Sequence, residues 1–192
     1  MALDIEFNSQ HFIAASVNIL LQTIGELPIE TLEDIDNVLE AKIAQDVILE
    51  AKMLILAKGW DVNTDTNYVF SPDTDGYINV PVNVLDIRSG TDIVMREWKL
   101  YDKSTRSRKF DAPVECDVKW NLDFNTLPHS LRYYITIYAA RVFQARQISD
   151  TNMYRFTQED EQKALIAVKQ SNGFTGQYNM LSGSHASNFS VL

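Results

Sequence analysis

Cysteine is almost absent from this chain of 192 residues, because Cys116 is the only one. A single cysteine excludes an internal disulfide and any zinc site built from several cysteines. The three histidines, His11, His129 and His185, fall in separate segments without the spacing of metal ligands. We therefore expect no metal and no cofactor, and we expect Cys116 to be a partly buried strand residue.

Long apolar runs are absent as well. No stretch approaches the roughly 20 apolar residues that a membrane-spanning helix needs. Asp4 and Glu6 stand where a signal peptide would carry Lys or Arg. These features predict a soluble protein that is made in the cytoplasm and has no membrane partner.

Basic residues are fewer than acidic ones, 17 against 26, so the formal net charge is -9. This balance argues against broad binding to nucleic acid or to anionic membranes. The charge is uneven, since Lys42 is the only basic residue among eight acidic ones between Glu26 and Glu50. The opposite sign gathers in a later segment, at Lys99, Lys103, Arg106, Arg108 and Lys109. The acidic and the basic segment have two interpretations: they help neighbouring copies to recognise each other, or each is simply a solvated surface. A third interpretation of the basic segment is that it faces passing DNA.

Apolar residues recur at helical spacing on both sides of the middle of the chain. The second helix begins with a capping box formed by Thr31 and Asp34 and ends at a left-handed cap, Gly59, which a hydrophobic contact of Trp60 closes. Helices are expected at about 9–24, 31–58, 128–148 and 157–170.

The period of the apolar residues changes to two between about 67 and 121. Ile78, Val80, Val82 and Val84 alternate with polar residues and with Pro81, which implies an edge strand or a bulge. Further strands are expected at 85–88, 93–98 and 114–120. The spacing predicts an antiparallel sheet or small sandwich inserted between the helices.

An acidic segment, Asp73 to Gly76, has two interpretations. As a calcium loop it lacks both end ligands, since Ser71 replaces the first acid and Val82 the closing glutamate. A Pro-Asp-Thr-Asp-Gly turn between two strands explains the same residues.

The helix expected at 128–148 is apolar on two sides. Its second side carries Tyr133, Ile137 and Ala140, with Arg141 next to them. A helix with two apolar faces must be covered twice. We expect these four residues to form an oligomer interface; complete burial within the subunit is the alternative.

The last segment, 172–192, is rich in Gly, Ser and Asn and should bury too little apolar surface to fold alone. Within it, the run Tyr178-Asn179-Met180-Leu181-Ser182-Gly183-Ser184 resembles the C-terminal signature of the tail tubular protein A family, the head-to-tail adaptors of short-tailed (podovirus) bacteriophages. Shorter matches to this family follow in order along nearly the whole chain, at 16–21, 24–28, 31–33, 58–63, 100–103, 110–111, 127–133 and 140–146. The chain departs from the family at Ser182 and Ser184, where acidic residues are expected.

The resemblance implies a structural protein of the virion tail, made in the cytoplasm of the host bacterium. It implies a twelve-fold ring between the portal protein and the tail nozzle protein (tail tubular protein B), with the tail fibre protein docked nearby and genomic DNA only in passage through the lumen. The tail residues expected to bind the portal or a neighbouring subunit are Phe174, Tyr178, Asn179, Met180 and Leu181.

The sequence contains none of the catalytic motifs for nucleotide binding, metalloproteases or serine hydrolases, so we expect no enzyme. Two alternatives stay open. One is a tail-associated polysaccharide depolymerase (glycoside hydrolase), because a pair of carboxylates can come from anywhere in the chain; the other is a nucleic-acid-binding module, which the net charge opposes.

The expected architecture is therefore α+β, a helical bundle with an inserted antiparallel β-subdomain and an extended C-terminal tail. We place the bundle at 1–62 and 125–171, the β-subdomain at 63–124 and the flexible tail at 172–192.

Overall fold

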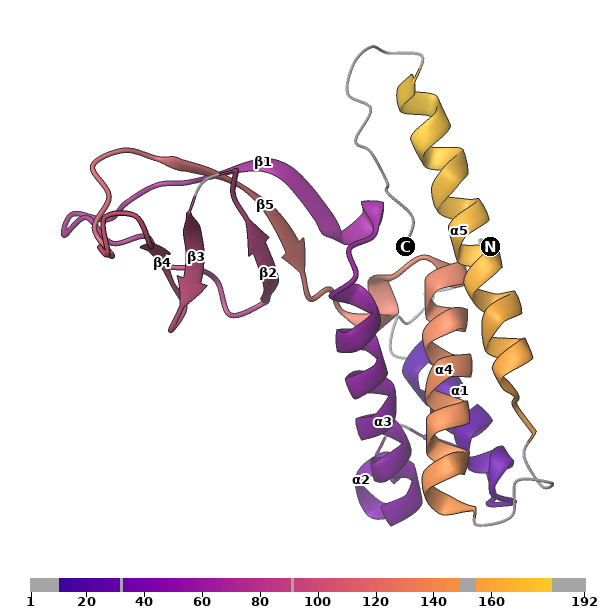
Figure 1. Cartoon of the computed structure of the whole chain (residues 1–192). Coiled ribbons are helices and arrows are strands. Elements are labelled where there is room, and N and C mark those ends of the chain that lie inside the picture. The colour runs from indigo at the N-terminus through magenta and orange to yellow at the C-terminus, as the bar shows by residue number, and fades with distance from the viewer. Residues whose placement is uncertain (1–10, 32, 91, 149–154, 181–192) are drawn as a thin grey trace, which may run out of the picture.

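The computed structural model describes residues 11–31, 33–90, 92–148 and 155–180. A bundle of helices carries an arm of short strands, which projects sideways from one end of the bundle (Figure 1). The helices are α1 (His11–Thr23), α2 (Asp34–Asn37), α3 (Leu39–Leu56), α4 (His129–Gln147) and α5 (Gln158–Met180). The strands are β1 (Thr64–Phe70), β2 (Val84–Arg88), β3 (Ile93–Arg96), β4 (Lys99–Asp102) and β5 (Val114–Trp120). The expected α+β class, a helical bundle with an inserted antiparallel subdomain, is confirmed.

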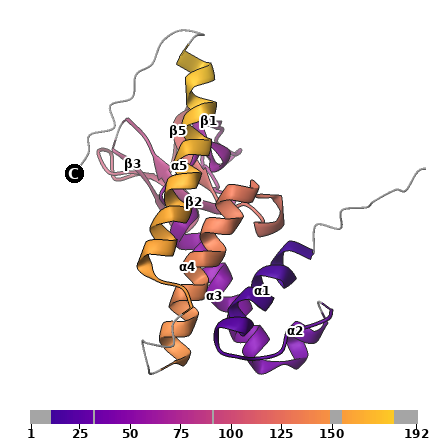
Figure 2. The same cartoon turned by 90° about the vertical axis from the view of Figure 1, so that its right-hand side faces the viewer.

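Helix α4 is the centre of the bundle. It packs against α1, α3 and α5, and the last two run in the opposite direction on either side of it (Figure 1). Figure 2, turned by 90°, shows α1 and α2 to one side of α4 and α5. Tyr134, Ile135 and Phe143 of α4 are fully buried among Leu20 of α1 and Ile48 of α3. Burying such a side chain stabilises a fold by about 1.5–3 kcal/mol, so these three residues contribute substantially to the core.

Two glycines end helices as their positions predict. Gly25 follows α1 with φ +82°, and Gly59 follows α3 with φ +81°. The Gly59 N–H donates to the carbonyl oxygen of Leu56, and Trp60 closes the cap as a buried residue whose Nε1 donates to the Ile55 carbonyl. The left-handed cap at Gly59 is confirmed.

The helix expected at 31–58 is broken at Val38. This residue has extended dihedrals, φ -111° and ψ 114°, and separates α2 from α3. The Asn37 side chain donates to the Glu33 carbonyl oxygen (3.1 Å), which offers the backbone an alternative to a continuous helical ladder. The carboxylate half of the expected capping box forms, because Asp34 accepts from the Thr31 N–H at 2.8 Å.

The last helix is longer than expected, since α5 ends at Met180 and not near residue 170. Gly173 and Gly176 each disfavour a helix by about 1 kcal/mol, which does not stop a helix that is already anchored by Ala164 and Val168. Its start is the second capping box, in which Asp160 accepts from the Thr157 N–H at 2.9 Å.

The arm has its own core and two small sheets. One sheet has the order β1-β5-β2, all antiparallel, and the other is the β3–β4 hairpin. The expected strands at 85–88 and 114–120 are confirmed as β2 and β5. The strand expected at 93–98 is shorter in the structure, where β3 ends at Arg96. The sequence analysis did not predict β1 and β4.

The strand expected at 78–84 is wrong. Only its last residue, Val84, belongs to a strand, because β2 begins there. Before Val84, Asn79 makes a single bridge to Lys99, and Val82 is 80% exposed, although Ile78 and Val80 are buried. Pro81 has no N–H for a ladder, and its carbonyl oxygen accepts from Val84 N in a turn that leads into β2.

Candidate interaction surfaces

A polar clasp joins the arm to the bundle, at the point where the chain leaves α3 and returns before α4. Asn63 is 1% exposed, and its side-chain amide donates to the carbonyl oxygens of Leu56 (3.0 Å) and Trp120 (2.8 Å). Its side-chain oxygen accepts from the Trp60 N–H (2.9 Å). One side chain thus connects the end of α3, the outgoing linker and the returning strand.

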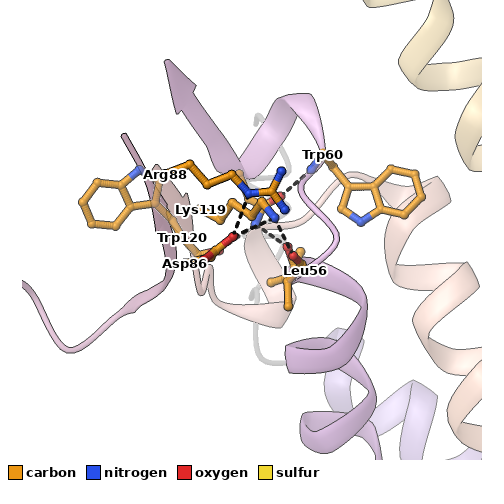
Figure 3. Close-up of polar contacts among 8 residues, drawn as sticks. Leu56, Trp60, Asp86, Arg88, Lys119 and Trp120 are labelled. Atoms are coloured by element: carbon orange, nitrogen blue, oxygen red, sulfur yellow. Dashed lines mark hydrogen bonds and ion pairs between the residues drawn. The ribbon is translucent and has the colours of Figure 1, made fainter. Parts of the chain in front are cut away.

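Lys119 is the second member of the clasp (Figure 3). Its Nζ donates to the carbonyl oxygen of Ala57 at 2.9 Å and pairs with the Asp86 carboxylate at 3.0 Å, and Arg88 reaches the same carboxylate at 3.4 Å. Gly59 makes room for it, because a Cβ there would lie 2.9 Å from the Lys119 Cε. The clasp therefore fixes how β5 and β2 sit on α3, and sequence reasoning missed it because its members are spread over 64 positions.

Some residues of the predicted basic patch contact other side chains of the arm, and others are exposed to solvent. Arg108 pairs with Glu97 at 2.9 Å, which holds the pKa of that carboxyl below its usual range. Lys99 and Lys109 lie over the ring of Tyr77, 4.4 and 5.5 Å from its centroid. Lys103 and Arg106 are exposed. The structure brings Lys99 and Lys109 together at Tyr77, and the role of the basic residues stays a prediction.

The acidic segment at 73–76 is a turn. The Asp73 carboxylate accepts from the backbone N–H groups of Asp75 (3.0 Å) and Tyr77 (2.8 Å) and from the Asn79 amide (3.1 Å). These bonds lower the pKa of Asp73. Among the described residues, no group of three His, Cys, Asp or Glu side chains is placed to hold a metal ion.

The expected oligomer interface on α4 needs a correction. Ile137 is 2% exposed and Ala140 fully buried, because α1, α3 and α5 of the same chain cover α4. Arg141 is bonded to Glu161 of α5 at 2.5 Å. Tyr133 alone is open, with 49% of its surface exposed. The alternative of burial within the subunit is therefore the one found for Ile137 and Ala140, and the contact at Tyr133 stays a prediction.

The residues expected to bind the portal fall in two places. Phe174, Tyr178, Asn179 and Met180 lie on the last turns of α5. Leu181 lies outside the described residues.

Cys116 is confirmed as a strand residue and is buried more deeply than expected, at 2% exposure. Burial raises the pKa of its thiol. Since the thiolate is the reactive form, burial disfavours reaction of this thiol.

The model of the tail tubular protein family matches residues 14–178, which takes in the bundle, the arm and most of α5. The chain belongs to the tail tubular protein family. It is also similar to the tail tubular protein A of Klebsiella phage KP34, with 26% identity over 159 residues that cover 81% of this chain and 84% of that protein. A tail tubular protein is a structural component of a phage tail, so the suspected family and the placement in the virion tail are confirmed at this level. None of the helices in the described part of this tail tubular protein is long and apolar enough to cross a bilayer.

Proposed function

We propose that this tail tubular protein is a head-to-tail adaptor. In this role its copies form a ring, twelve-fold as the family resemblance implies, between the portal protein and the tail nozzle protein. The ring closes the wall of the DNA channel and helps to anchor the tail fibres. The observation that carries the proposal is the extent of the family match, residues 14–178, because it spans the whole architecture and not one module.

The architecture supports a mechanical role. A channel wall requires subunits that keep their shape, and α4 is held on three sides by α1, α3 and α5. Hydrogen bonds of Asn63 and Lys119 tie the arm to the bundle and restrain how the two parts move against each other.

Electron microscopy of purified particles tests the proposal. A gold or Fab label on this chain should mark the junction between capsid and tail, and the isolated chain mixed with portal complexes should add a ring to them. A label at the distal tip of the tail, or portals that gain no density, would contradict it.

The end of α5 is proposed as the portal contact. Aromatic and apolar anchors of the kind that dominate interfaces are provided by Phe174, Tyr178, Met180 and Leu181, and Asn179 adds a polar group among them. A chain truncated after Asn172 should lose only the part of α5 that follows this residue, keep the rest of its helices and strands, and bind portal complexes more weakly in a pull-down. If the truncated chain binds portal complexes as well as the full chain does, the portal contact lies on another part of the chain.

The role is structural and not catalytic. Two acids of the arm, Asp73 and Asp102, accept hydrogen bonds within their own turns and are not held ready for substrate. Purified protein incubated with capsular polysaccharide should release no reducing sugar. Release that disappears in a carboxylate variant would establish a depolymerase instead.

A further inference from the structure

A groove of about 150 Å³ lies between α1 and α4, which pack side by side (Figure 2). Most of its lining is apolar, and Tyr133, one of the lining residues, leaves 49% of its surface exposed. Two hydroxyls in the lining, those of Ser16 and Thr136, are hydrogen-bonded to each other at 2.9 Å. Because these polar groups already have partners, the groove suits apolar side chains.

The groove begins next to the start of α1. The Arg132 guanidinium lies 3.7 Å from the centroid of the Phe12 ring, and one turn further Ser16 is bonded to Thr136, so the two helices run in the same direction along the groove. Phe12 follows the first residue of α1, and Ile19 lines the groove two turns later. Seven helical residues cover about 10 Å, which gives the length of the groove along α1.

The ten residues that precede α1 lie outside the described part of the chain, and their sequence matches the groove. Leu3, Ile5 and Phe7 alternate with Asp4 and Glu6. In an extended chain such alternation places the three apolar side chains on one side and the two carboxylates on the other. From residue 3 to residue 7 an extended chain covers about 13 Å, which is close to the length of the groove.

The connection to α1 has the composition of a turn. It consists of Asn8, Ser9 and Gln10. Asn and Ser are common in turns and at helix starts, because their side chains bond to nearby backbone groups. This connection lets the chain reverse its direction between residue 7 and α1.

The charges of the groove also suit this segment. None of the described residues that line it is acidic. Arg132 lines it, and within the described part of the chain this cation makes no ion pair with a carboxylate. Helix α4 begins beside the groove, at His129, with no capping side chain and no acid in its first turn. A positive helix start and an unpaired guanidinium both favour carboxylates such as those of Asp4 and Glu6.

We propose that residues 3–7 bind in the α1–α4 groove of their own subunit, extended and opposite in direction to α1, with Leu3, Ile5 and Phe7 facing the groove. The segment is tethered directly at the groove, and short tethers give effective concentrations in the millimolar range, so a separate partner has to compete with it. Tyr133 is then covered by its own chain and not by a neighbouring subunit. The contact does not depend on the proposed ring.

An engineered disulfide in the full chain tests the contact. Ile5→Cys is combined with Tyr133→Cys, and the control combines Ile5→Cys with Met53→Cys on α3, where Met53 is also 49% exposed. The native Cys116 stays in place, since it is only 2% exposed. Under mild oxidation, the first pair should form a disulfide within one chain on the order of tenfold faster than the control pair. Electrophoresis without reductant and mass spectrometry measure both rates, which should not depend on protein concentration.

Proteolysis provides a second measurement that needs no new cysteine. Chymotrypsin cleaves after Leu3 and Phe7, and a bound segment is protected from it. Tyr133→Ser removes an anchor from the groove, so early cleavage at these two positions should be on the order of tenfold faster than in the wild type. Met53→Ser, which removes an equally exposed side chain from α3, should be cleaved like the wild type.

Three results would overturn the proposed contact. Equal oxidation rates for the two cysteine pairs would show that the segment has no preference for the groove. Cleavage that is the same in the wild type and in Tyr133→Ser would show that the groove does not protect it. A disulfide that joins two chains would mean that the segment of a neighbouring copy occupies the groove.

Discussion

The Nζ of Lys119 lies 2.9 Å from the carbonyl oxygen of Ala57, so strand β5 is bonded to the end of α3 across 62 positions of sequence. A cation at the C-terminal end of a helix is favourable, because the last carbonyl groups there lack partners within the helix. The Gly59 cap brings the chain close enough for this bond, and Asn63 completes the connection between arm and bundle.

Replacing Gly59 with alanine should lower the free energy of unfolding by more than the left-handed backbone alone explains. An alanine at φ +81° costs about 1–2 kcal/mol, and its Cβ must also displace the Lys119 side chain. Gly25→Ala is the matched control, since Gly25 has φ +82° with no atom within 4 Å of its added Cβ. In urea denaturation, Gly59→Ala should lower the free energy of unfolding more than Gly25→Ala does. This difference between the two variants should vanish when Lys119 is also replaced with alanine. Equal losses at the two glycines would mean that Lys119 moves aside at no cost.

Asn63→Ala should destabilise the protein by about 2–4 kcal/mol, because it removes three hydrogen bonds from a buried site, including the one that the Trp60 N–H donates. Asn121→Ala provides the comparison. The side-chain oxygen of Asn121 is buried without a hydrogen-bond partner, so its removal should cost much less. Chemical denaturation measures both, and hydrogen exchange should rise at β1 and β5 only in the first variant. If Asn121→Ala lowers the free energy of unfolding as much as Asn63→Ala does, the hydrogen bonds of Asn63 are not what holds the clasp together.

Lys52→Met should stabilise the protein by about 1 kcal/mol at neutral pH. Lys52 is only 8% exposed, and burial lowers the pKa of its ammonium group, which the nearby Asp123 only partly offsets. A methionine of similar shape avoids this desolvation. The exposed Lys58→Met should have little effect.

The same lysine should make stability depend on pH in the alkaline range. Between its lowered folded pKa and its unfolded pKa near 10.4, the unfolded chain binds the proton and the folded chain does not. The contribution of Lys52 to stability therefore rises with pH in this window. Denaturation curves of wild type and Lys52→Met at several alkaline pH values should converge, and a constant gap between them would contradict the assignment.

Ile137→Glu should unfold the subunit and not merely prevent assembly. The side chain is 2% exposed, and an unpaired carboxylate in such a site costs about 3–5 kcal/mol. Tyr133→Glu, four residues earlier on the same helix and 49% exposed, should leave the circular dichroism melting curve almost unchanged. An Ile137→Glu variant that stays folded would restore the idea that this face of α4 opens toward a neighbouring subunit.

Patterns among neighbouring residues predicted much of the fold. The helical period predicted α1, most of α3 and α4, and the pair Gly59 and Trp60 predicted how α3 ends, because spacing, capping and left-handed glycine act within a few residues. The same holds for β5, whose alternation is complete within its own seven residues. The family resemblance also came from the order of short local runs.

Contacts between distant segments decided the rest. Strand β1 carries exposed polar residues such as Asp65, Thr66 and Asn67, and it is a strand because β5 supplies its ladder. Ile137 lies on an apolar side of α4, and it is buried because α1, α3 and α5 pack on that helix in the folded chain. The positive φ of Trp98 is likewise a property of the folded hairpin, which large side chains do not favour locally. In each case the free energy comes from groups that meet only when the chain has folded, so no window of neighbouring residues contains the information.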